Sequence, residues 1–332
     1  GASRLAAFLG LSPLAIGLTV VAYGTSAPEM AVSIQAGLGG NPNIAVANVV
    51  GSNIFNILFI LGLCGLILPL TVSRQLVRRD VPVMILASLV TFAMAWDGTI
   101  ARGEAFVLLA GLVAYTVMTL RTSRRDQEAV INEYADDYGQ APGPRAKALR
   151  MLGCVALLVV GLVLLVVGSR WFVGGAVKIA QWLGVSDVII GLTLVAAGTS
   201  LPEVAASIIA ALRNERDIAV GNAVGSNICN LLAILGVAGA VTPGGLAVAP
   251  EMMRVDLPFM IAVAVICWPI FYNGYNITRR AGILLFAGYV VYTLYLILHA
   301  SQSGWLAAVG KLALLGVILV AGFLVTLAAR CW

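Results

Sequence analysis

Long apolar stretches alternate with short polar or glycine-rich connections along the whole chain. A helix that crosses a membrane needs about 20 mainly apolar residues. The pattern predicts ten such helices and therefore an all-α polytopic membrane protein. The expected spans are 13–37, 43–69, 80–96, 104–120, 150–171, 187–212, 218–241, 256–273, 281–299 and 304–329. The composition agrees, because only 11% of the 332 residues are charged, against about a quarter in soluble domains.

One segment of the chain occurs twice. Ile16–Gly62 and Ile190–Gly236 align without gaps at a constant offset of 174 residues, and about two-thirds of the paired residues are identical. The repeat preserves polar groups inside apolar spans. They are Thr25, Ser26, Glu29, Ser52, Asn53 and Asn56 in the first copy, and Thr199, Ser200, Glu203, Ser226, Asn227 and Asn230 in the second.

The basic residues predict the orientation of the spans. If the spans alternate, 15 of the 20 Lys and Arg residues fall on one side of the membrane, which is then the cytoplasmic side. That side contains the N-terminus and the segment 121–149. Five spans separate the starts of the two copies, an odd number, so the copies enter the membrane from opposite sides as inverted repeats.

The repeats suggest how the chain is organised. We expect a first transmembrane half at 1–120, a cytoplasmic linker at 121–149, a second half at 150–299 and an extra helix at 304–329. At the 174-residue offset Gly1 matches Gly175, so the span that leads into the second copy has no counterpart in the first. The first half is therefore expected to lack its first helix.

The helix that carries each glutamate is expected to break. Gly24 and Pro28 precede Glu29, and Gly198 and Pro202 precede Glu203. Proline removes a backbone donor and clashes with the preceding turn. We expect the carbonyls of Ala22, Thr25, Ala196 and Thr199 to be freed and to point into the protein. Inverted repeats with broken helices are typical of secondary transporters, whose substrates bind near the membrane midplane.

Glu29 and Glu203 are the acidic residues that lie deep within predicted spans. A charge at the centre of a spanning helix costs at least about 2.5–3.5 kcal/mol and usually serves a function. The alternative is that both are neutral, hydrogen-bonded structural groups. Serine and threonine also pack membrane helices for structural reasons. Ligands that are all oxygen favour Ca²⁺ and Na⁺ over transition metals.

The motifs GTSAPE with VVGSNIFN, and GTSLPE with AVGSNICN, resemble the two repeats of the sodium/calcium exchanger branch of the cation/calcium exchanger superfamily, in its prokaryotic form. The resemblance implies that Glu29 and Glu203 bind Ca²⁺ together with the carbonyls of Thr25 and Thr199. It implies that Na⁺ uses the same glutamates, the side chains of Ser26, Ser52, Ser200 and Ser226, and the carbonyls of Ala22 and Ala196. Asn56 and Asn230 would complete the centre, directly or through water.

Two departures from the family limit the resemblance. Some exchangers of this branch, including potassium-dependent ones, have an aspartate where this chain has Asn230. The site then carries at most two negative charges, and potassium co-transport is not expected. The linker 121–149 is also too short for the calcium-sensing domains of animal exchangers, so regulation by such domains is not expected.

The sequence thus predicts an alternating-access antiporter in a prokaryotic plasma membrane that expels Ca²⁺ in exchange for Na⁺ and moves net charge. A H⁺/Ca²⁺ exchanger is the alternative, and a cation channel a more distant one. An enzyme is not expected, because the chain has a single histidine and no paired aspartate or zinc motif. No cofactor, nucleic acid or obligatory protein partner is predicted; the partners are Ca²⁺, Na⁺ and the lipid bilayer.

Two further pairs of residues are assigned structural roles. Asp80 and Asp256 each precede a Val-Pro or Leu-Pro step at the start of a span, where a carboxylate caps a helix and meets its dipole. Asp97 and Asn273 are each followed by glycine, which predicts turns.

Overall fold

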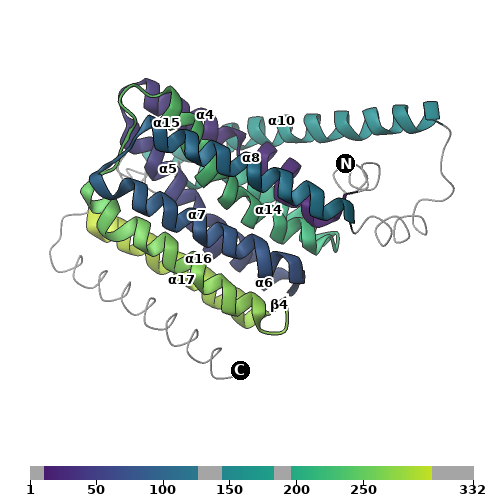
Figure 1. The fold of residues 1–332 in the computed structure, drawn as a ribbon. Coiled ribbons are helices and arrows are strands. Elements are labelled where there is room, and N and C mark those ends of the chain that lie inside the picture. The colour runs from purple at the N-terminus through teal and green to yellow at the C-terminus, as the bar shows by residue number, and fades with distance from the viewer. Residues whose placement is uncertain (1–10, 126–143, 183–195, 301–332) are drawn as a thin grey trace.

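The computed structural model describes residues 11–125, 144–182 and 196–300, which form a bundle of long helices (Figure 1). The predicted span 304–329, most of the linker 121–149 and the first part of the span 187–212 lie outside the described residues. Within these residues, seven helices are long and apolar enough to cross a membrane, and two shorter apolar helices accompany them. The prediction of an all-α membrane fold is confirmed.

The first helix of each repeat is broken immediately before its glutamate. In the first repeat the segments are α2 (Pro13–Ile16), η1 (Gly17–Val21), α3 (Ala22–Thr25) and α4 (Ala27–Leu38). In the second they are α12 (Ala196–Thr199) and α13 (Leu201–Leu212). The breaks fall at Ser26 and Ser200, whose ψ angles are 8° and 7°. Pro28 and Pro202 lie in the first turn after each break, where the missing N–H is tolerated. The predicted breaks are therefore confirmed.

The second helix of each repeat is continuous and contains a π-helical turn. One consists of α5 (Pro42–Phe55), η2 (Asn56–Leu61) and α6 (Gly62–Ile67). The other consists of α14 (Arg216–Cys229), η6 (Asn230–Ile234) and α15 (Leu235–Val241). The π turns begin at Asn56 and Asn230, which are equivalent positions in the repeats. Such turns inside α-helices are frequent at functional sites.

The remaining helices surround these central ones. The first half provides η3 (Leu76–Asp80), α7 (Val81–Met94), η4 (Ala95–Asp97) and α8 (Arg102–Arg125). The second half provides η7 (Met252–Asp256), α16 (Leu257–Tyr272) and α17 (Arg279–Ala300). The helix α10 (Pro144–Trp182) has 39 residues, so it is about 58 Å long at 1.5 Å per residue. The predicted span 150–171 was too short, because the apolar part of α10 continues to Ile179.

Small residues allow the central and outer helices to approach closely. A Cβ atom added at Gly62 of α6 would lie 2.7 Å from the backbone nitrogen of Phe286 on α17. In the other half, a Cβ atom at Gly236 of α15 would lie 2.8 Å from Leu109 on α8. Close packing of this kind is a principal source of helix association in membranes. The two halves thus pack their outer helices in equivalent ways.

Two short antiparallel strand pairs join the halves. β1 (Leu70–Thr71) pairs with β4 (Asn276–Ile277), and β2 (Thr99–Ile100) pairs with β3 (Leu246–Ala247). Each pair takes one strand from each half, so each connection is tied to the opposite repeat. The turns predicted at Asp97 and Asn273 are confirmed, since Gly98 and Gly274 follow them with φ angles of 87° and 71°.

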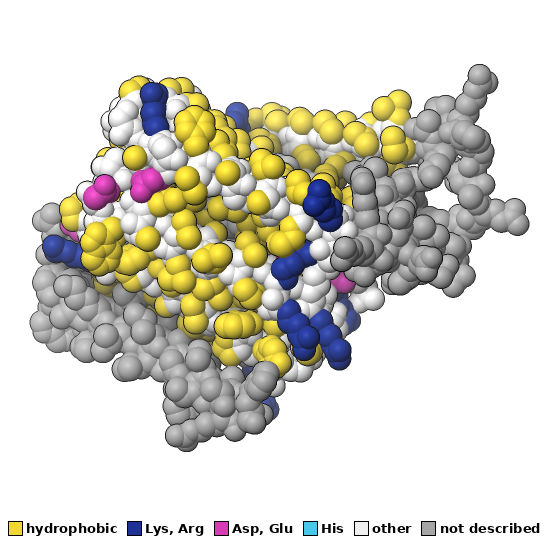
Figure 2. All heavy atoms as spheres, in the orientation of Figure 1, with side chains coloured by type: hydrophobic (Ala, Val, Ile, Leu, Met, Phe, Trp, Pro, Cys, Tyr) yellow, Lys and Arg dark blue, Asp and Glu magenta, His cyan; other side chains and the backbone are white. Residues whose placement is uncertain are grey.

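The surface is suited to a bilayer. Figure 2 shows apolar side chains across the side of the bundle, with most of the visible basic side chains toward one end and a few at the other. Large apolar residues such as Leu86, Phe106 and Leu152 are 60%, 61% and 67% exposed. An apolar surface of this extent is expected where lipid replaces water as the solvent.

Candidate cation-binding site

The two glutamates lie at the start of the helices that follow the breaks. Glu29 is in the first turn of α4 and Glu203 is in the first turn of α13, and each is only 1% exposed. The N-terminus of a helix carries partial positive charge, which stabilises a nearby carboxylate. α4 contacts η6 of the other repeat, and α13 contacts η2. Each glutamate helix therefore lies against the π turn that begins with the other repeat's asparagine.

Each carboxylate is held by a serine of the opposite repeat. The Ser26 hydroxyl donates to Glu203 Oε1 at 2.9 Å, and the Ser200 hydroxyl donates to Glu29 Oε1 at 2.8 Å. Both serines occupy the helix breaks. The second carboxylate oxygens, Glu29 Oε2 and Glu203 Oε2, are buried and have no hydrogen-bond partner within the described structure. The breaks thus fix one oxygen of each carboxylate and leave the other available to a ligand.

Four asparagines form a second set of cross-repeat contacts. The Asn56 side-chain amide donates to Asn227 Oδ1 at 3.0 Å, and the Asn230 amide donates to Asn53 Oδ1 at 3.0 Å. The side-chain N–H groups of Asn56 and Asn230 are turned toward these partners, so their side-chain carbonyl oxygens point away from Asn227 and Asn53. Both Oδ1 atoms are buried and find no partner in the described part of the chain.

A further pair of asparagines, Asn48 and Asn222, bonds to the backbone carbonyls of the two glutamates. The Asn48 amide donates to the Glu29 carbonyl at 3.1 Å and to Ser33 at 3.0 Å. In the second repeat the Asn222 amide donates to the Glu203 carbonyl at 3.3 Å and to Ser207 at 2.9 Å. The sequence analysis did not single out these residues. The signal was present, because they also recur at an offset of 174 residues.

The remaining predicted residues surround the breaks. Thr25 Oγ1 lies 3.3 Å from the Ala22 carbonyl oxygen and 3.2 Å from Asn222 Oδ1, two acceptors that share its single hydrogen. The Ala22 carbonyl also accepts the Ser26 N–H at 3.0 Å. The expectation that this carbonyl is freed is therefore wrong, because the chain continues in a helical turn as far as Ser26. Ala196 and Thr199 occupy the equivalent places in α12.

The two remaining serines differ from each other. Ser52 Oγ lies 3.3 Å from Ser200 Oγ, so it adjoins the hydroxyl that holds Glu29. Ser226 Oγ is buried and has no hydrogen-bond partner among the residues that the structure describes. Ser52 thus adjoins the break at Ser200, whereas Ser226 is buried in α14 without such a contact among the described residues.

The donor set is suited to hard cations. Across the described ranges, no group of three or more His, Cys, Asp and Glu residues could hold a metal ion. The site instead combines two carboxylates with neutral amide and hydroxyl oxygens. Ca²⁺ takes six to eight oxygen ligands of this kind, whereas softer metals prefer nitrogen and sulfur.

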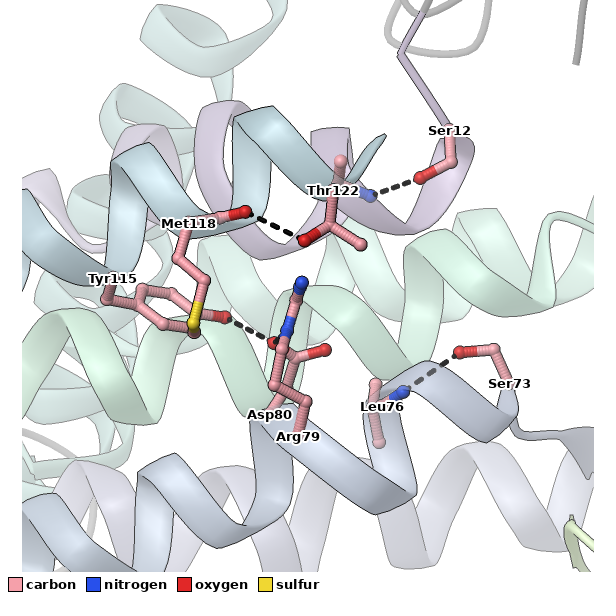
Figure 3. Close-up of polar contacts among 9 residues, drawn as sticks. Ser12, Ser73, Leu76, Arg79, Asp80, Tyr115, Met118 and Thr122 are labelled. Atoms are coloured by element: carbon pink, nitrogen blue, oxygen red, sulfur yellow. Dashed lines mark hydrogen bonds and ion pairs between the residues drawn. The ribbon is translucent and has the colours of Figure 1, made fainter. Parts of the chain in front are cut away.

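Asp80 and Asp256 do not cap their helices, contrary to the expectation from sequence. Neither side chain bonds to the start of its helix, because each helix already begins one turn earlier as the π segment η3 or η7. The Tyr115 hydroxyl from α8 donates to Asp80 at 3.3 Å, and Arg79 pairs with the same oxygen at 3.1 Å (Figure 3). The Tyr292 hydroxyl from α17 donates to Asp256 at 2.9 Å. Both aspartates thus bind a tyrosine of a neighbouring helix.

Comparison with known proteins gives the family. Residues 1–121 and 154–298 match the sodium/calcium exchanger protein family. The putative antiporter CaxA of Alkalimonas amylolytica is 42% identical over 74% of this chain and 75% of its own length. The inner membrane protein YrbG of Escherichia coli K12 is 36% identical over 88% of each chain. A solved structure of the sodium–calcium exchanger NCX_Mj, 31% identical, superposes with a TM-score of 0.73 over 88% of this chain and 90% of that one.

The inverted repeats and the buried oxygen site define an integral membrane transporter with discontinuous helices. The chain belongs to the sodium/calcium exchanger family. Its relatives are transporters, so the expectation that the protein is not an enzyme is confirmed.

Proposed function

We propose that this protein exchanges Na⁺ for Ca²⁺ by alternating access, with Glu29 and Glu203 as the shared ligands. The observation that supports this most directly is a set of four buried acceptor oxygens without a hydrogen-bond partner in the described structure: Glu29 Oε2, Glu203 Oε2, Asn56 Oδ1 and Asn230 Oδ1. An unpartnered buried acceptor is costly. A bound cation removes that cost at all four atoms.

Exchange follows from the shared carboxylates. Ca²⁺ would bind Glu29 and Glu203 with the carbonyls of Thr25 and Thr199. Na⁺ ions would use the same carboxylates with Ser26, Ser52, Ser200 and Ser226 and the carbonyl of Ala196. Because both sets of ions need the same two negative charges, they exclude each other. Without either, two carboxylates that lie close enough to repel each other would oppose closure of the site.

The distribution of charge supports an orientation and a direction. Most of the basic side chains visible in Figure 2 lie toward one end of the bundle, and basic residues accumulate on the cytoplasmic side of membrane proteins. We place that end and the linker 121–149 in the cytoplasm. The inward Na⁺ gradient would then drive Ca²⁺ out of the cell.

The transport cycle should move net charge. With neutral Asn56 and Asn230 at its centre, the site carries two negative charges and is neutral with Ca²⁺ bound. Three bound Na⁺ would leave a charge of +1. Moving one elementary charge across the membrane changes the energy by about 2.3 kcal/mol per 100 mV, so an inside-negative potential favours Na⁺ entry and Ca²⁺ exit.

The test is Ca²⁺ uptake into proteoliposomes loaded with Na⁺, compared with K⁺-loaded vesicles and with vesicles under an imposed pH gradient. We expect uptake only with internal Na⁺, and faster uptake when valinomycin and K⁺ make the interior positive. The matched control carries Glu29→Gln and Glu203→Gln together. Uptake driven by the pH gradient alone would identify a H⁺/Ca²⁺ exchanger instead. A rate that ignores the potential, together with no exchange current at any potential, would contradict electrogenic exchange.

A further inference from the structure

Two methionines lie behind the asparagines of the site. Met84 of α7 and Met260 of α16 are 0% and 2% exposed. The Asn227 amide donates to the Met84 sulfur at 3.6 Å, and the Asn53 amide donates to the Met260 sulfur at 3.7 Å. The same contact therefore occurs in both halves, and in each case the methionine and the asparagine come from opposite halves.

These contacts use all the hydrogen-bonding groups of the two inner asparagines. Asn227 has two amide hydrogens; one reaches the Asn53 carbonyl at 3.1 Å and the other reaches Met84. Its Oδ1 accepts from Asn56. Asn53 makes the mirrored contacts with the Asn227 carbonyl, Met260 and Asn230. No hydrogen-bonding group of either side chain is left over.

The sulfur and a backbone carbonyl together favour one orientation of each inner amide. A thioether accepts a weak hydrogen bond but cannot donate one. Rotating the Asn227 amide by half a turn would place its oxygen against the Met84 sulfur and the Asn53 carbonyl, and its N–H group against the Asn56 N–H group. All three contacts would then be lost. The buried sulfur thus favours the orientation in which Asn227 presents its oxygen to Asn56.

We propose that Met84 and Met260 are positioning residues for ion binding, acting through Asn227 and Asn53 to keep the oxygens of Asn56 and Asn230 turned toward the cation. Met84 orients Asn227, Asn227 holds the N–H group of Asn56, and the Asn56 oxygen is left for the ion. Met260, Asn53 and Asn230 form the equivalent series. The inference rests on the proposed role of Asn56 and Asn230 as ion ligands.

The central variant is Met84→Leu, which keeps an apolar side chain of similar size and removes the acceptor. One Asn227 hydrogen then has no partner, and the orientation of the amide depends only on the Asn53 carbonyl and Asn56. We expect Ca²⁺ affinity to fall by about three- to tenfold, the range that one hydrogen bond supplies. Met260→Leu should have an effect of similar size, and the double variant should approach the product of the two.

Two further variants separate positioning from packing. Met84→Gln restores an acceptor oxygen at similar length and should recover Ca²⁺ affinity to within about twofold of the unmodified protein. Met94→Leu, on the same helix and partly buried against the core, should leave affinity unchanged. Met260→Gln repeats the rescue in the other half in case Met84→Gln fails to fold.

The measurement is the Ca²⁺ dissociation constant, obtained by fitting the rise of the melting temperature with Ca²⁺ concentration to the linkage relation RT ln(1 + [Ca²⁺]/Kd), with the ion-free melting temperature as a check on folding. It does not depend on which ion drives transport. If the unmodified protein shows no Ca²⁺-induced stabilisation, the proposed function fails. If it does, but Met84→Leu and Met260→Leu bind as well as the unmodified protein, the positioning role is wrong. Equal losses in the Leu and Gln variants would show that the methionines act by packing.

Discussion

Glu29 and Glu203 occupy equivalent places in the two repeats, whereas the residues that tie the repeats to the neighbouring helices differ. In the first half, Asp80 is fully buried beside Arg79, and in the second half Asp256 follows Val255 and is partly exposed. Tyr23 of the first repeat bonds to Thr116, while the equivalent residue of the second repeat is Ala197.

This contrast separates two demands on an inverted-repeat transporter. Under the proposed function, both repeats supply equivalent ligands to one ion, so the proposed ligands are expected to be the same in both repeats. Equivalent outer helices of the two halves instead run in opposite directions across the membrane. Alternating access requires that the site is open to one side of the membrane while it is closed to the other. Differences between the two repeats are therefore expected where they contact the outer helices rather than at the ion site. The following predictions test that division.

The largest effect should come from the glutamates, and it should be the same in both repeats. Glu29→Gln and Glu203→Gln each remove one unit of charge beside a divalent ion, which at an effective dielectric constant of about 20 is worth several kcal/mol. We expect each to lower Ca²⁺ affinity by more than about a hundredfold, with the folded protein retained. Ca²⁺-induced shifts of the melting temperature measure this. A strong loss in one variant and near-normal binding in the other would contradict the symmetry of the site.

The aspartates should differ between halves, in stability rather than in ion binding. Asp80→Asn leaves Arg79 with a neutral partner and should lower the free energy of unfolding by about 3–5 kcal/mol. Asp256→Asn should cost about 1 kcal/mol, the value of a single hydrogen bond. Thermal unfolding in detergent compares the two.

The matched control is Arg79→Gln combined with Asp80→Asn, which removes both charges and should recover part of the stability. Equal losses of unfolding free energy for Asp80→Asn and Asp256→Asn would show that the ion pair of Asp80 with Arg79 adds nothing to stability. An unchanged Asp80→Asn single variant would contradict the prediction in the same way.

Substitutions of Ser52 and Ser226 test whether the neutral residues next to the carboxylates contribute equally to ion binding in the two repeats. Ser226→Ala removes a hydroxyl that has no partner in the described structure, so it should weaken Na⁺ dependence by about threefold and leave Ca²⁺ binding nearly intact. Ser52→Ala also removes a neighbour of the hydroxyl that holds Glu29. We expect Ser52→Ala to weaken the binding of Na⁺ and of Ca²⁺ by a similar factor. The Na⁺ and Ca²⁺ concentrations for half-maximal exchange provide the comparison, and identical profiles for the two variants would argue against the asymmetry.

Much of the fold could be predicted from the sequence because the bilayer requires long apolar helices and the repeat marks the equivalent ones. The breaks before Glu29 and Glu203 followed from proline chemistry. The full length of α10 could not be predicted, because Arg170 and Trp171 suggested an end at the membrane interface, whereas the apolar helix continues to Ile179. The structural role of Asp80 was also missed, since its partner Tyr115 is 35 residues away in the chain and no local pattern connects them.

For the candidate site, the repeated polar residues predicted which side chains to examine but not how they contact one another. The crossing of Ser26 to Glu203 and of Ser200 to Glu29 depends on how the two repeats interlock. The Ala22 carbonyl was expected to be free because a proline follows, yet the helix continues long enough to supply it with donors. Such details depend on tertiary geometry, which a repeat alone does not specify.

The smallest effect is expected from Tyr23→Phe. The Tyr23 hydroxyl lies 2.7 Å from Thr116 Oγ1. Thr116 in turn donates to the Leu112 carbonyl at 2.8 Å, so Tyr23 is the donor. Removing it leaves no donor without a partner, and the cost should be about 0.5–1 kcal/mol. The bond links the first broken helix to α8, and Ala197 can make no such bond in the second repeat.

A contact that exists in one repeat only can bias the equilibrium between the two access states. If the first broken helix moves relative to α8 during transport, Tyr23→Phe should shift that equilibrium by about two- to fivefold, the population change that 0.5–1 kcal/mol allows. The apparent Ca²⁺ affinities measured from the two sides of the membrane should then change in opposite directions. Thr116→Val, which removes the acceptor, is the matched control and should act in the same sense. Affinities that change equally on both sides would show that the bond stabilises the protein without distinguishing its two access states.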